Sequence, residues 1–84
     1  MDIRFTQSAR KHRIGKAHAK FVIRNYESKF VPGDSTTADK RIWIGQDDRG
    51  LELEIVAIIS GDGLVVIHVM PTVFRRVEKE WNLK

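Results

Sequence analysis

Residues 64–76, "LVVIHVMPTVFRR", begin as a run of branched aliphatic residues, place a histidine within it and become basic after a proline. The aliphatic run predicts a buried strand, and the apolar stripe after Pro71 predicts a helix. His68 stands where the pattern favours another aliphatic residue. It is either a core histidine whose N–H is satisfied by a backbone carbonyl, or one side of a functional site.

The turn before this strand leaves both interpretations open. A two-residue turn within "SGDG" would place His68 opposite Ile55 or Ala57, on the core face of the preceding strand. A one-residue bulge would instead turn His68 towards Glu54 and Val56. The face that His68 occupies therefore depends on the strand register.

The rest of the chain adds two strands and two helices to this stretch. The turns "QDDRG" and "SGDG" join three apolar segments as hairpins. The predicted elements are helices over 6–14 and 16–26, a polar connection over 27–39, strands over 40–45, 51–59 and 64–70, and a helix over 72–81. This pattern predicts one α+β domain over residues 1–84, in the order α-α-β-β-β-α, with helices packed on a small antiparallel sheet.

Length and composition are those of a soluble domain. The 84 residues are 42% hydrophobic and 31% charged and include no cysteine, which excludes disulfides, thiolate metal sites and thiol nucleophiles. The sequence holds no run of about 18 apolar residues that could span a membrane, and its N-terminus has no apolar signal segment. We therefore expect a cytoplasmic protein that does not contact membranes.

Basic residues are concentrated in the first third of the chain. Residues 1–25 hold seven Lys and Arg residues against one acidic residue, whereas residues 26–84 hold eight against ten. A basic segment of this density indicates either a surface that binds a polyanion or a solvated helical face.

The predicted sheet also carries a group of polar residues. Glu52 and Glu54 project from one face of the middle strand. If the isoleucines of the first strand face the core, Arg41 and Trp43 share the open face with these glutamates. Such a face could bind or cleave a nucleotide, because acid–base chemistry and base stacking need these groups. The alternative is a plain cross-strand ion pair.

Motifs for several other chemistries are absent. The sequence has no Walker loop, no Gly-x-Gly-x-x-Gly and no Gly-x-Ser-x-Gly. Its three histidines, His12, His18 and His68, show no metal-ligand spacing. We expect neither a metal nor a cofactor.

Three segments together resemble a known family. "FTQSARKHRIGKAHAKFVIRN", "RIWIGQDDRGLELEIVAI" and "LVVIHVMP" are similar to small bacterial proteins related to the BrnT toxins, within or near the RelE/ParE-like toxin–antitoxin group. The resemblance implies helices followed by a small antiparallel sheet. It also implies a ribonuclease that inhibits translation and is neutralised by a cognate antitoxin.

This resemblance and the residues themselves lead to one functional hypothesis, a metal-independent endoribonuclease that uses the RNA 2′-OH as nucleophile. His68 or Glu54 would serve as base or acid. The residues expected to stabilise the phosphate charge are Arg41, Arg75 and Arg76. The residues expected to hold the RNA are Arg10, Lys11, Arg13, Lys20 and Trp43.

Two other functions fit the same sequence. The first is a non-enzymatic module that binds nucleic acid or protein through the same sheet and basic segment. The second is a purely structural domain, which leaves the basic first third unexplained.

Overall fold

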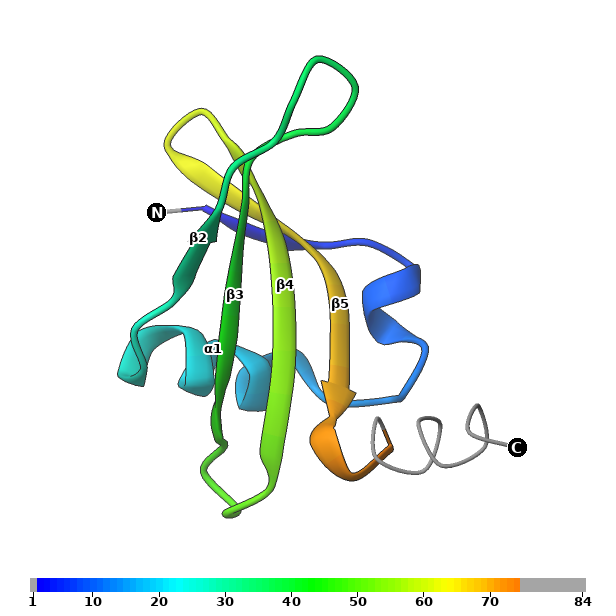
Figure 1. Ribbon diagram of the computed structural model, residues 1–84. Helices are drawn as coiled ribbons and strands as arrows, with labels where there is room; N and C mark the ends of the chain where they lie inside the picture. Colours follow the sequence, from blue (N-terminus) through cyan, green and yellow to red (C-terminus); the bar gives the residue numbers. More distant parts are fainter. Residues whose placement is uncertain (1, 75–84) are drawn as a thin grey trace, which may run out of the picture.

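The computed structural model describes residues 2–74 as a five-stranded sheet with one α-helix packed on one face (Figure 1). The elements are β1 (Ile3–Phe5), the 3₁₀ turn η1 (Ser8–Arg10), α1 (Lys16–Asn25), β2 (Lys29–Val31), β3 (Lys40–Gln46), β4 (Glu52–Ser60) and β5 (Gly63–Pro71). The strand order is β1-β5-β4-β3-β2. Strand β1 runs parallel to β5, and the other neighbouring strands are antiparallel. The sheet is therefore mixed.

The predicted order α-α-β-β-β-α is wrong, beginning with the first helix. Residues 6–14 contain only the short turn η1. Thr6 Oγ1 donates a hydrogen bond to the Val66 carbonyl and accepts one from the Ala9 N–H, which ties the start of the segment to the sheet. At the other end, Arg13 adopts a left-handed backbone with a φ of 58°, which a continuing right-handed helix excludes.

Strands β1 and β2 are also missing from the prediction. Each has three residues, too few to display a strand period in the sequence. Both exist because a longer neighbour supplies their hydrogen bonds: β1 pairs with β5, and β2 pairs with β3. Residues 72–74 are helical, as predicted for the start of the helix over 72–81, and the rest of that helix lies outside the described residues.

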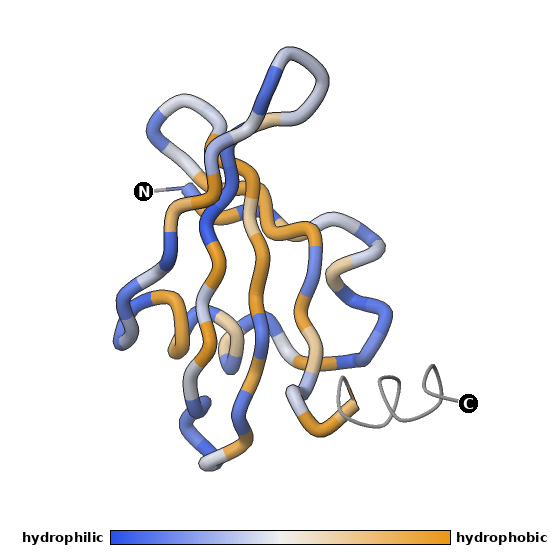
Figure 2. The backbone as a smooth tube through the Cα atoms, viewed as in Figure 1, coloured by the Kyte–Doolittle hydropathy of each residue, from blue (hydrophilic) through white to orange (hydrophobic). Residues whose placement is uncertain are grey.

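The core lies between α1 and the sheet. Ala19, Val22 and Ile23 of α1 are buried, and the helix predicted over 16–26 is confirmed as far as Asn25. They pack against the buried sheet residues Trp43, Leu53, Ile55, Ala57, Val66 and Val69. Figure 2 shows the apolar residues concentrated along the central strands. Each fully buried aliphatic side chain contributes about 1.5–3 kcal/mol, so this layer is the main source of stability.

No helix of residues 2–74 covers the other face of the sheet in Figure 1. On this face Val56 and Ile58 of β4 are half-buried, and Ile44 of β3 is 49% exposed. We call it the open face. It is the face on which the candidate site lies.

Candidate functional site

A β-bulge in β5 decides the face that His68 occupies. Ala57 pairs with Val66, but the next residue of β4, Val56, pairs with His68, so Ile67 is an extra residue. Val66 points towards α1 and is fully buried, whereas the His68 side chain lies on the open face and is 34% exposed. The register is the bulged alternative, and His68 is not a residue of the α1-side core.

His68 and Glu54 form a close pair on the open face. His68 Nε2 lies 3.3 Å from Glu54 Oε1, and the Glu54 side chain is only 15% exposed. The Nε2 atom is shielded from solvent and forms no hydrogen bond with any residue in the described part of the chain. An imidazole and a carboxylate in this arrangement are suited to general acid–base catalysis, in which a positioned group moves a substrate proton.

Residues from η1 and the turn after it complete a hollow around this pair. Ser8, Lys11 and His12 line the hollow together with Glu54 and His68, and its volume is about 480 Å³. The rings of His12 and His68 meet edge to face, with their centroids 6.5 Å apart. The hollow therefore gathers two imidazoles, a carboxylate, an ammonium group and a hydroxyl.

The bulge also helps to position Ser8 and the residues after it, which line the hollow together with His68 and Glu54. Ser8 Oγ donates a hydrogen bond of 3.1 Å to the carbonyl of Ile67, the extra residue. The ring of His12 packs against that of Phe74, with centroids 5.6 Å apart. One irregularity in β5 thus turns His68 outwards and anchors the segment that carries the other groups.

Arg41 and Trp43 do not share this face, contrary to the prediction. Strand β3 has the opposite orientation: Trp43 pairs with Ile55 of the core face and is only 4% exposed. It is Ile42 and Ile44 that lie on the open face. The physical reason is that the large indole buries more apolar surface against α1 than an isoleucine would. Trp43 is consequently unavailable for stacking on a base at the open face.

The other predicted binding residues are distributed around the start of α1. Arg10 and Arg13 line a neighbouring hollow at this point. Lys20 is half-buried on α1. Lys11 is the predicted RNA-binding residue that lines the same hollow as His68. Arg75 and Arg76 lie outside the described residues.

The sequence does not place His12 or Ser8 in the candidate site, where both line the hollow. His12 was considered only as a metal ligand, and its one signal was a titratable ring within the basic run at 10–13. Nothing in the sequence indicates that this run ends beside the middle of β5.

A second polar cluster lies where the β3–β4 turn meets α1. His18, Asp47 and Asp48 place possible metal-ligand atoms within 4.8 Å of one another. Burial opposes ionisation of Asp47, but hydrogen bonds from the Arg49 side chain and from the N–H groups of Arg49 and Leu51 outweigh it and lower its pKa. His18 Nδ1 contacts the Asp48 carboxylate. Groups of the turn and His18 of α1 thus supply partners for both carboxylates, so we assign the cluster a structural role.

Comparison with family models, with curated proteins and with solved structures finds no match to this chain. The resemblance to BrnT-like toxins therefore stays a prediction. Within residues 2–74, no helix has the length and apolar character needed to cross a membrane.

Proposed function

We propose that the protein is a metal-independent endoribonuclease whose site is the hollow around His68. The observation that carries this proposal is the His68–Glu54 pair facing His12 and Lys11 across one hollow. Cleavage of RNA without a metal needs a base, an acid and a cation near the phosphate, and these four side chains supply all three.

The reaction follows from these roles. One imidazole removes the proton from the 2′-OH, and the resulting oxygen attacks the adjacent phosphorus. The bond from phosphorus to the 5′ oxygen breaks, and the second imidazole gives a proton to that leaving oxygen. The products are a 2′,3′-cyclic phosphate and a 5′-OH. The ammonium group of Lys11 stabilises the charge that develops on the phosphate oxygens, and Glu54 orients His68.

The basic residues beside the hollow support binding of a nucleic acid strand. Arg10 and Arg13 lie within two residues of Lys11 in the chain and are exposed. Counterion release from the phosphates drives such binding. A toxin role with a cognate antitoxin, in the cytoplasm, belongs to the same proposal. Induction of the protein alone should then arrest bacterial growth, and co-expression of a neighbouring antitoxin should restore it.

The test is cleavage of a single-stranded RNA in the presence of EDTA. We expect a cyclic phosphate product, and no product from the same RNA with a 2′-deoxy residue at the cleaved position. His68→Gln and His12→Gln should each reduce the rate at least about 100-fold, the usual contribution of general acid–base catalysis.

The matched control is His18→Gln, because His18 belongs to the β3–β4 turn cluster and does not line the hollow. It should leave the cleavage rate within about twofold of that of the wild type. Equal losses in all three histidine variants, or cleavage that EDTA abolishes, would contradict the proposal.

A non-enzymatic RNA-binding module is the second candidate. It is favoured by the basic surface that continues beyond the hollow, where Arg10, Arg13 and Lys16 line a space without an acid–base pair. In that case the wild-type protein should bind the RNA and release it intact.

A further inference from the structure

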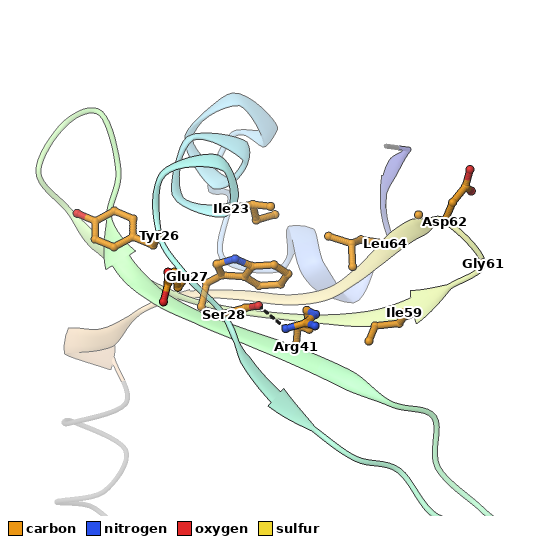
Figure 3. Close-up of a pocket in the computed structure, with 11 residues that line it drawn as sticks. Ile23, Tyr26, Glu27, Ser28, Arg41, Ile59, Gly61, Asp62 and Leu64 are labelled. Carbon is orange, nitrogen blue, oxygen red and sulfur yellow. Dashed lines mark hydrogen bonds between the residues drawn. The ribbon is translucent and has the colours of Figure 1, made fainter.

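A second cleft lies on the α1 side of the sheet and plays no part in the proposed cleavage. Its volume is about 570 Å³, which is within the range of small-molecule sites. It runs between the end of α1, strand β3 and the β4–β5 turn. Figure 3 shows Tyr26 and Glu27 at one end and Asp62 at the other, with Arg41 between them.

Arg41 is a fixed cation in this cleft. Its Nη1 donates a hydrogen bond of 3.0 Å to Ser28 Oγ, and its guanidinium lies 5.5 Å from the centroid of the Phe30 ring. Arg41 is half-buried, yet it forms no ion pair with any residue of the described range 2–74. A guanidinium binds a carboxylate with two parallel hydrogen bonds, and Arg41 keeps donors available for one.

Part of the wall around Arg41 is apolar. Ile23, Trp43 and Leu64 form the buried floor of the cleft, and Ile59 is half-buried. The ring of Tyr26, which is 40% exposed, offers a flat surface for an aromatic ring at one end. The floor and the Tyr26 end are therefore complementary to an apolar body, with the Arg41 cation beside it.

The charge of the cleft limits the ligand to a single negative charge. Glu27 and Asp62 also line it, so its ionised side chains sum to one negative charge before a ligand binds. Direct pairing with the Arg41 guanidinium offsets the repulsion that both acids exert on one carboxylate. A second negative charge would be repelled by both acids without a cation to pair with. We propose that this cleft binds a small molecule that carries one carboxylate on a flat, apolar body.

The proposal is tested by titrating the ¹⁵N-labelled protein with 2-naphthoate, with the neutral 2-naphthamide and with 2-naphthyl phosphate. We expect 2-naphthoate to cause saturable amide shifts that centre on Ile23, Trp43 and Leu64. The amide and the phosphate should bind at least about tenfold more weakly. Equal binding of the amide, tighter binding of the phosphate, or the absence of saturable shifts at these residues would overturn the proposal.

Two variants identify the cation. Arg41→Gln should weaken 2-naphthoate binding at least tenfold, whereas Arg24→Gln, which removes an exposed charge from α1 outside the cleft, should change it less than twofold. Because the wild-type comparison of acid and amide needs no variant, it decides the question even if Arg41→Gln fails to fold. RNA cleavage is measured at the other face, so failure of either proposal is visible independently of the other.

Discussion

Asp47 and Arg41 show two ways in which this protein holds a buried or half-buried charge. The Asp47 side chain is fully buried, and the Arg49 side chain pairs with it at 2.7 Å. Two backbone N–H groups also donate to it. Arg41 has a hydroxyl and an aromatic ring as partners, but no carboxylate among the described residues. A satisfied charge of the first kind serves stability, whereas the second kind keeps binding capacity for a ligand.

The first prediction concerns Asp47. Asp47→Asn should lower the free energy of unfolding by about 1–3 kcal/mol at neutral pH, because it removes the charge from hydrogen bonds that hold the turn. The pKa of Asp47 is lowered in the folded state. Its contribution is therefore complete above the ordinary aspartate pKa of about 3.9, and it is lost as the pH falls through the lower folded value.

Urea unfolding at a series of pH values checks this prediction. The difference between wild type and Asp47→Asn should shrink as the pH falls below about 4. Asp62→Asn is the control, since Asp62 lies exposed in the β4–β5 turn and should change stability by no more than about 0.5 kcal/mol. If the difference in free energy of unfolding between wild type and Asp47→Asn did not change with pH, the turn would be held by the packing of this side chain and not by its charge.

At the scale of elements, long periodic segments could be predicted from the sequence. The predicted helix over 16–26 and strands over 40–45, 51–59 and 64–70 correspond to α1, β3, β4 and β5 within about one residue at each end. These segments carry enough apolar residues to display their period. The short β1 and β2 could not be predicted, because their backbone bonds come from residues far along the chain.

The candidate site depended on two features that local sequence does not encode. The bulge at Ile67 changes the face of every later residue of β5, and only then does His68 meet Glu54. In β3, successive residues project to opposite faces of the sheet, and both faces receive apolar residues: Trp43 on one, Ile42 and Ile44 on the other. The pattern alone therefore could not decide whether the tryptophan or the isoleucines are buried. His68 and Glu54 were identified by their chemical type, whereas Trp43 was assigned to the wrong face.

Gly45 shows why β3 has its orientation. It lies on the α1 side, opposite the fully buried Leu53, and the ring of Tyr26 packs directly over it. A Cβ atom at position 45 would lie 2.5 Å from the nearest carbons of this ring. The glycine therefore permits the end of α1 to approach β3, and it fixes one end of the Arg41 cleft.

The second prediction follows from this contact. Gly45→Ala should destabilise the protein by about 1–3 kcal/mol, the usual cost of overpacking, although alanine is otherwise better than glycine within a strand. In a Tyr26→Ala background the same change should cost less than about 0.5 kcal/mol, because the clash is gone. Thermal or urea unfolding of the four proteins measures the coupling. An equal cost in both backgrounds would place the strain in the strand backbone instead.

At the scale of the whole molecule, the sheet separates two polar regions. Glu54 and His68 lie on the open face, and Arg41 lies on the α1 side. The basic segment from Arg10 to Arg13 borders the hollow on the open face, through Lys11. A long polyanion can therefore engage the basic segment and the His68 hollow together, while the Arg41 cleft stays free.

The last prediction measures this engagement through its salt dependence. Each cation that neutralises a phosphate of single-stranded RNA adds roughly −0.7 to the slope of log affinity against log salt. If about four cations contact one strand, the slope should be near −3. Replacing Arg10, Lys11 and Arg13 by glutamine should flatten it by about 2. The fold should persist, because all three side chains are exposed.

The control removes the same charge from the other edge of the sheet and the outer side of the helix. Its three substitutions are Arg24→Gln, Lys29→Gln and Lys40→Gln. Because long-range attraction weakens equally with net charge in both triple variants, only the loss of direct phosphate contacts distinguishes them. The control should therefore keep a slope within about 0.7 of the wild-type value, with folding of each protein verified by circular dichroism. Equal flattening in both variants would mean that RNA affinity depends only on the net charge of the protein. The basic segment beside His68 would then have no specific role in positioning the strand.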